Sequence, residues 1–125
     1  MVMDDQEQEI YDLISYEIKM KYANALVFHQ KLKTVQEVYP AISVMMIDNN
    51  EVVDYNTFEN NQIVCQEKYR FEAAHQDFSS VKDILAIIDQ NMKSLGYIRT
   101  YVGIDENQET NDIRRISEYE KLIIK

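Results

Sequence analysis

Three residues whose side chains could catalyse a reaction or bind a metal lie far apart in this sequence: His29, Cys65 and His75. A cysteine beside a histidine can act as a nucleophile, because the imidazole takes the thiol proton. Metal sites need several such ligands at short spacing, which these residues do not have. Cys65 also falls in an alternating apolar pattern, where cysteine packs as a small hydrophobic residue. We therefore predict no catalytic residue, no metal site and no cofactor, and the chain is not expected to be an enzyme.

Two groups of charged residues have open interpretations. Four acidic residues fall in a predicted loop over residues 103–112: Asp105, Glu106, Glu109 and Asp112. The pair Asp105 and Glu106 could bind a divalent cation, or the loop could simply be solvated. The pair Arg114 and Arg115 could bind an anion or form ion pairs on an edge strand.

Composition limits the class of protein. The chain has 125 residues, the size of one domain, with 46% hydrophobic and 28% charged residues and a net charge of −9. This charge argues against nucleic-acid binding, because proteins that bind nucleic acids usually carry a basic patch. A protein that mimics DNA, or one with a protein-binding surface, remains compatible with the charge. No run of about 18 apolar residues predicts a membrane span. The acidic N-terminus lacks the apolar core of a secretory signal. A lone cysteine cannot form an internal disulfide, so we expect a cytoplasmic origin.

The clearest element is a helix over residues 80–96. Its apolar residues recur at helical spacing and form one stripe: Val81, Ile84, Leu85, Ile88, Met92 and Leu95. Ser80 is the predicted N-cap, and Asp83 is placed to reach back to the first turn. Gly96 is expected to end the helix in a left-handed conformation.

Strands are predicted on both sides of this helix, over residues 63–74 and 97–102. An amphipathic helix is expected over residues 4–20, and Pro40 precedes a buried strand over residues 41–48. We expect a turn at residues 48–50, a short strand at 51–55, a loop at 56–62 and a final strand at 113–124. Residues 21–39 could extend the first helix or contain a strand; we favour a helix ending near residue 25 and an extended segment at 27–33.

Together these elements predict a single α+β domain over residues 1–125. Its sheet is expected to be mostly antiparallel, with the N-terminal helix and the central helix packed on one side.

The order of segments carries a resemblance. The chain contains YPAISVMMIDNNEV, a strand ending in YRFEA, the helix SSVKDILAIIDQNMKSLGYIRT and a last strand beginning NDIRRISEYEKLI. This order resembles the tail-terminator and minor-capsid (head–tail joining) proteins of tailed bacteriophages. The matching motifs are Ile47-Asp48-Asn49, residues 69–71, residues 95–99, and Ile113 with Arg115. The chain departs from the family at Arg114, where an aromatic residue is common, and at the link over residues 75–78. Its first 38 residues carry no match.

The resemblance implies a virion structural protein that forms a ring, expected to be a hexamer. The ring would terminate the tail tube and join it to the head or neck, with tail-tube, sheath or connector proteins as partners. It would be assembled in the bacterial cytoplasm, without a membrane and without tight nucleic-acid binding. In that ring, the acids Asp105, Glu106, Glu109 and Asp112 would face the lumen or a partner, and Arg114 and Arg115 would be subunit-interface charges. The alternative is a small acidic interaction or inhibitor protein that mimics DNA.

Overall fold

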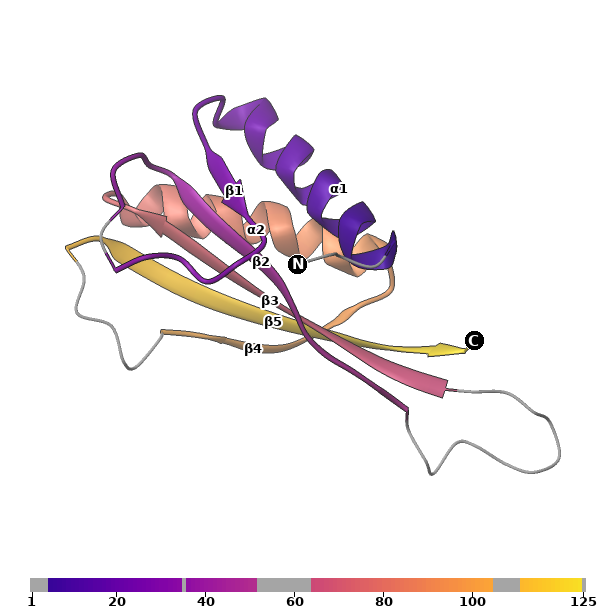
Figure 1. Ribbon diagram of the computed structural model, residues 1–125. Coiled ribbons are helices and arrows are strands. Elements are labelled where there is room, and N and C mark those ends of the chain that lie inside the picture. The colour runs from indigo at the N-terminus through magenta and orange to yellow at the C-terminus, as the bar shows by residue number, and fades with distance from the viewer. Residues whose placement is uncertain (1–4, 35, 52–63, 105–110, 125) are drawn as a thin grey trace, which may run out of the picture.

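The computed structural model describes residues 5–34, 36–51, 64–104 and 111–124. The described chain is an α+β fold of two helices and five strands, in the order α1 (Asp5–Lys21), β1 (Leu26–Phe28), β2 (Ala41–Glu51), β3 (Val64–His75), α2 (Phe78–Ser94), β4 (Ile98–Gly103) and β5 (Ile113–Ile124). The strands form one open sheet in the order β1-β2-β3-β5-β4 (Figure 1). The β1–β2 pair is parallel and the other pairs are antiparallel, so the predicted fold class is confirmed.

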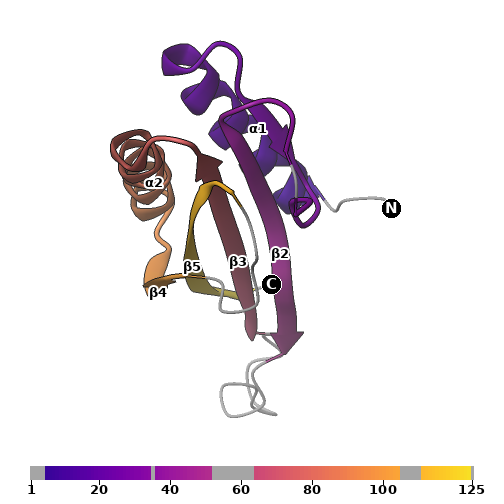
Figure 2. The ribbon, with the colours of Figure 1, turned by 90° about the vertical axis from the view of Figure 1, so that its left-hand side faces the viewer.

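Both helices lie on the same face of the sheet (Figure 2). In α1, Ile10, Ile14 and Ile18 recur every four residues and are buried, as the helical period requires. Ile84 and Ile88 of α2 are buried in the same core. The sheet supplies Tyr69, Phe71, Tyr119 and other alternate residues of its strands to this core.

The ends of α2 confirm one predicted cap and correct another. Gly96 has φ +89°, and the amide of Tyr97 donates to the Met92 carbonyl over 3.0 Å, so the helix ends in the predicted left-handed conformation. The N-cap is Asp77, not Ser80. The Asp77 backbone is extended, and its carboxylate accepts from the Ser79 amide over 3.1 Å and from the Ser80 hydroxyl over 2.9 Å. Asp83 does not reach back to the helix start but pairs with Lys21 of α1.

The strand β2 is longer than predicted. Residues 48–50, predicted as a turn, continue β2 and pair with Lys68, Glu67 and Gln66 of β3. Asn and Asp favour turns when the chain is free, but here the neighbouring strand satisfies their backbone groups. The short strand predicted at 51–55 and the loop predicted at 56–62 lie, beyond residue 51, outside the described residues. The predicted strands over 63–74, 97–102 and 113–124 are confirmed as β3, β4 and β5.

The segment that follows α1 was the hardest to predict. The helix ends at Lys21, and the strand that follows covers only Leu26–Phe28, so the predicted helix end near residue 25 is wrong and the extended segment is shorter than expected. The amide of Leu26 donates to the Pro40 carbonyl over 3.0 Å, which begins the parallel pairing of β1 with β2.

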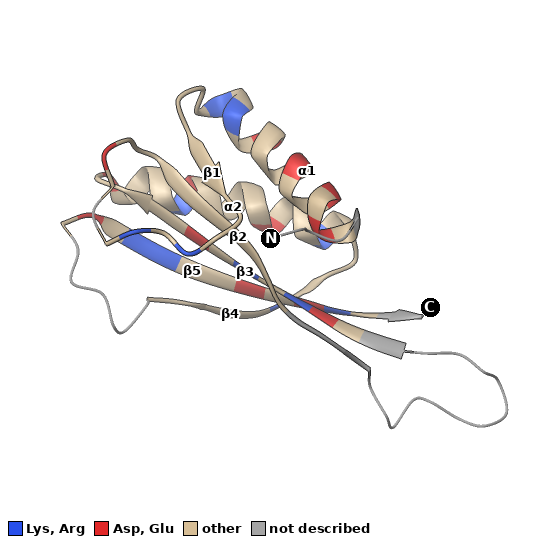
Figure 3. Ribbon diagram, in the orientation of Figure 1, with Lys and Arg blue, Asp and Glu red and all other residues tan. Residues whose placement is uncertain are grey.

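No helix of the described residues lies on the second face of the sheet. Charged residues alternate along β3 and β5 (Figure 3). On this face Lys68 Nζ lies 3.8 Å from Glu120 Oε2, and Arg70 Nε lies 3.7 Å from Glu118 Oε2. Towards the end of the sheet at Ala74, this face is covered by Leu32 from the segment after β1. The sheet therefore has one dry face and one face that is partly wet, as its alternating strands require.

Candidate interaction surface

Two of the predicted site residues, Asp112 and Arg114, bind each other inside the chain. Arg114 Nε lies 2.7 Å from Asp112 Oδ1, and the two side chains are 2% and 1% exposed. The Arg114 guanidinium also donates to the carbonyls of Lys33 and Thr34, and the Tyr39 hydroxyl donates to Asp112 over 2.6 Å. The carboxylate of Asp112 is thus turned into the protein and away from a lumen, and Arg114 is turned into the fold and away from a subunit contact.

Arg115, the next residue, has a different environment. Its guanidinium carbon lies 5.1 Å from the ring centroid of Phe78, and Lys82 Nζ lies 5.6 Å from the same ring. Cations over an aromatic face are weakly attracted to it. Among the described residues, no carboxylate forms an ion pair with Lys82 or Arg115. Arg115 therefore belongs to a cationic patch at the start of α2. The other predicted acids, Asp105, Glu106 and Glu109, lie outside the described residues.

The residues considered for catalysis are not brought together. His29 follows β1 and packs edge-on against Tyr11, whereas His75 ends β3 and accepts from the Asp77 amide over 3.1 Å. The Cys65 side chain lies outside the described part. No three His, Cys, Asp or Glu side chains of the described residues are positioned to hold a metal ion.

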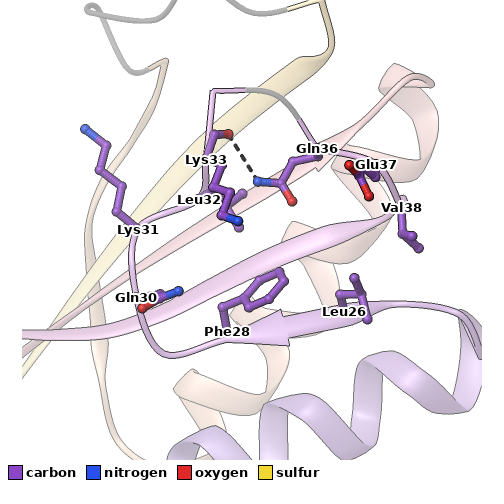
Figure 4. Close-up of a pocket in the computed structure, with 9 residues that line it drawn as sticks. All are labelled: Leu26, Phe28, Gln30, Lys31, Leu32, Lys33, Gln36, Glu37 and Val38. Atoms are coloured by element: carbon purple, nitrogen blue, oxygen red, sulfur yellow. Dashed lines mark hydrogen bonds between the residues drawn. The ribbon is translucent and has the colours of Figure 1, made fainter. Parts of the chain in front are cut away.

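The first hollow lies beside β1 (Figure 4). It has a volume of about 290 Å³, and its walls are Leu26 and Phe28 from the strand and Leu32 and Val38 from the segment after it. The Gln36 amide donates to the Lys33 carbonyl over 3.1 Å and holds this segment in a loop. Polar and charged side chains complete its lining: Gln30, Lys31, Lys33, Gln36 and Glu37.

A second hollow, the β4 groove, lies between α2 and β4 on the helix-covered face. It has a volume of about 290 Å³. α2 supplies one wall, β4 the other and β5 the floor, through Lys82, Leu85, Ala86, Asp89, Arg99, Val102, Ser117 and Tyr119. The Ser117 hydroxyl on the floor is buried and has no hydrogen-bond partner among the described residues.

A bulge in β4 creates the outer wall of this groove. The register of β4 against β5 shifts between Arg99 and Tyr101, so that Arg99 lies opposite Tyr119 and Val102 lies opposite Ser117. Tyr119 and Ser117 share a face of the sheet, and therefore Arg99 and Val102, three residues apart, face the same side. A strictly alternating strand would have placed them on opposite sides. This wall could not be predicted from the sequence, because bulge positions leave no clear signal in one sequence.

Asp89 is the anionic centre of the β4 groove. Its carboxylate lies 2.8 Å from Lys93 Nζ and accepts from the Tyr119 hydroxyl over 2.8 Å, with Arg99 at 3.5 Å. Burial opposes the charged form, but the hydrogen bonds from Lys93 and Tyr119 outweigh it and lower the pKa of Asp89. Burial and the Asp89 carboxylate together raise the pKa of Tyr119. Asp89 is thus already partnered, and Lys82 is the cation of the groove that no described carboxylate neutralises.

The two edges of the sheet differ. At the β1 edge, the Tyr11 hydroxyl of α1 donates to the Val27 carbonyl over 2.6 Å, so α1 covers a backbone group of this edge. At the β4 edge, no described strand pairs with the outer side of β4. The apolar side chains there are largely exposed, with Ile98 68%, Tyr101 44% and Val102 48% exposed. An open apolar edge strand is a template for association with another chain.

No family model matches this chain. No curated protein matches it either. Within the described residues, no helix is both long enough and apolar enough to cross a membrane.

Proposed function

We propose that this protein is a structural subunit of a phage or phage-like tail, which forms a ring that terminates the tail tube and joins it to the head or neck. The observation that carries the proposal is the difference between the two sheet edges: at one, α1 binds the Val27 carbonyl through Tyr11, and at the other, apolar side chains of β4 are exposed. Two unlike surfaces on opposite sides of a subunit suit a head-to-tail contact. Such contacts close into rings when the rotation between subunits allows it.

The arrangement of the resembling motifs also supports the proposal. Residues 95–99 lie where α2 ends and β4 begins, and Ile113 and Arg115 lie at the start of the last strand, as in the family pattern. One motif departs from that pattern: Ile47, Asp48 and Asn49 lie within β2 rather than in a turn. The proposal depends on the order of elements and not on this motif.

The test is assembly. Purified protein is examined by sedimentation and by electron microscopy, alone and with the tail-tube protein encoded beside it. The expected result is a ring, of six subunits if the family pattern holds, that binds the ends of tail tubes. Protein that stays monomeric or dimeric even with tail-tube protein present would overturn the proposal and favour the acidic inhibitor. Labelling of this chain in intact particles should place it between tail and head.

A further inference from the structure

The β4 groove carries positive charge in a strongly acidic protein. The chain has a net charge of −9, yet three cations lie along this groove. Lys82 and Arg115 lie beside Phe78 at the start of α2, and Arg99 lies at the other end, beside Asp89. Arg99 has Asp89 as a neighbour at 3.5 Å, and Lys82 and Arg115 have no carboxylate partner among the described residues. An acidic surface that reaches this groove would be attracted to it. The groove walls add the apolar side chains of Leu85, Ala86 and Val102.

A surface of matching chemistry lies on α1. Its exposed face carries Glu9, Asp12, Tyr16 and Met20, which we name the α1 stripe. Spacings of three and four residues place these side chains along one line of the helix. The first two are acidic, and the last two are apolar and 63% and 69% exposed. Large exposed apolar side chains beside acids form a surface suited to a groove with apolar walls and cations.

The two surfaces lie on opposite sides of the molecule. α1 covers the β1 edge through Tyr11, and the β4 groove lies at the other end of the strand order (Figures 1 and 2). A chain therefore cannot place its own α1 stripe in its own β4 groove. We infer that the β4 groove binds the α1 stripe of a second copy, with the acids of the stripe against Lys82 at the start of α2 and with Tyr16 and Met20 against the apolar wall. In this binding mode, an amphipathic helix of one subunit docks into a groove of the next subunit.

The inference rests on the proposed ring, since it assigns the two halves of its subunit contact. Repetition of one such contact carries each subunit to the next in the same direction. The same contact can therefore add one subunit after another. The rotation that relates neighbouring subunits decides whether they close into a ring.

Charge reversal tests the pairing. Lys82→Glu would place a carboxylate against Glu9 and Asp12, and Asp12→Lys would place an ammonium against Lys82. Each single variant should weaken self-association about tenfold, because like charges across an interface repel. The double variant reverses both surfaces and should recover most of this loss. Glu37→Lys changes the charge by the same amount on the exposed loop beside β1 and should leave association unchanged.

The measurement is the concentration at which half of the protein is assembled, determined by sedimentation for each variant. Circular dichroism confirms that each variant is folded. Rings that form equally well in all variants would overturn the inference but leave the proposed function intact. Rings weakened by both single variants and not restored by the double variant would also overturn it, since the two residues would then belong to different contacts. Wild-type protein that never assembles, even with tail-tube protein, would overturn both the inference and the proposed function.

Discussion

Arg114 and Asp112 form an ion pair inside this fold, with Nε and Oδ1 2.7 Å apart and both side chains almost fully covered. The same guanidinium binds the carbonyls of Lys33 and Thr34, which lie some 80 residues earlier in the chain. The pair therefore ties the segment between β1 and β2 to the start of β5. Two adjacent arginines that look equivalent in the sequence thus have different environments, because side chains alternate between the faces of a strand.

Replacing Arg114 should destabilise the fold far more than replacing Arg115. Arg114→Ala removes the cation that neutralises the buried Asp112 carboxylate, which should cost about 3–5 kcal/mol in the free energy of unfolding. Arg115→Ala removes a partly exposed cation beside Phe78 and should cost less than about 1 kcal/mol. Urea denaturation measures both values. Equal losses would show that the ion pair is not what supports this end of the sheet.

A double variant separates the charge from the packing. Arg114→Met with Asp112→Leu removes both charges together, and replacement of a buried pair by apolar residues is often close to neutral. The double variant should therefore be more stable than Arg114→Ala.

The apolar stripe of α2 should dominate the stability of the core. Ile88 is fully buried against the sheet, so Ile88→Ala should cost about 2–5 kcal/mol. Leu85 lies on the same stripe but is only partly buried, since it borders the β4 groove. Leu85→Ala should accordingly cost clearly less in the same denaturation experiment. A loss below about 0.5 kcal/mol for Ile88→Ala would contradict its placement in the core.

Much of this fold could be predicted from sequence, and the reason is periodicity. The helix α2 and the strands β3 and β5 have long, regular apolar patterns, and each was found near its observed position. The N-cap of α2 was misplaced, because Asp77 and Ser80 are both good caps and local sequence does not rank them. The turn predicted at residues 48–50 was wrong, because pairing with β3 overrides the turn preference of Asp and Asn.

The contacts that join the layers could not be predicted. Among the described residues, five tyrosine hydroxyls reach from the two core clusters to a polar partner: Tyr11 to the Val27 carbonyl, Tyr22 to Asp83, Tyr39 to Asp112, Tyr97 to Glu67 and Tyr119 to Asp89. Each pair is distant in sequence, and no local pattern links its members. The β4 groove was missed for the same reason, since it depends on a bulge and on how α2 lies over β5.

The aspartates that bridge elements should make stability depend on pH in the acid range. Hydrogen bonds from Lys21 and Tyr22 lower the pKa of Asp83, and those from Lys93 and Tyr119 lower the pKa of Asp89 against the effect of burial. A carboxyl group with a lowered pKa in the folded state stabilises the fold above its unfolded pKa of about 4. This stabilisation is lost as the pH falls through the lower, folded value.

The free energy of unfolding, measured in urea at a series of pH values, should therefore fall below about pH 4. Asp89→Asn should flatten this dependence, since it removes one of the two groups. Glu37→Gln, at an exposed position of the segment after β1 and outside both proposed contact surfaces, is the matched control and should leave the slope as in the wild type. A slope unchanged by Asp89→Asn would contradict the assigned hydrogen bonds.

Two buried tyrosines should titrate late in alkali. Burial raises the pKa of Tyr97 and Tyr119, and the carboxylates of Glu67 and Asp89 raise them further. The pKa of each tyrosine in the folded state lies above the unfolded value of about 10. The protonated hydroxyls therefore stabilise the fold below about pH 10, and this stabilisation is lost as the pH rises from there through the folded pKa. Tyrosinate absorbance should show part of the nine tyrosines ionising only as the protein unfolds. Ionisation of all of them near pH 10 in folded protein would contradict this burial.

The last prediction concerns DNA, which would pass through the ring during ejection if the proposed function holds. A lumen that bound phosphate would retard this passage, whereas a protein with a net charge of −9 repels it. The purified protein should therefore give no measurable shift of duplex DNA in a mobility assay at moderate salt. Lys82 and Arg115 at the start of α2 are described cations able to bind phosphate, and the proposed subunit contact places Lys82 against the α1 stripe of a second copy. Tight binding that weakens with salt and is abolished by Lys82→Glu would contradict both that assignment and the picture of a passive channel. It would instead make the β4 groove a nucleic-acid site, because loss of salt-sensitive affinity on removing one cation is the signature of a phosphate contact.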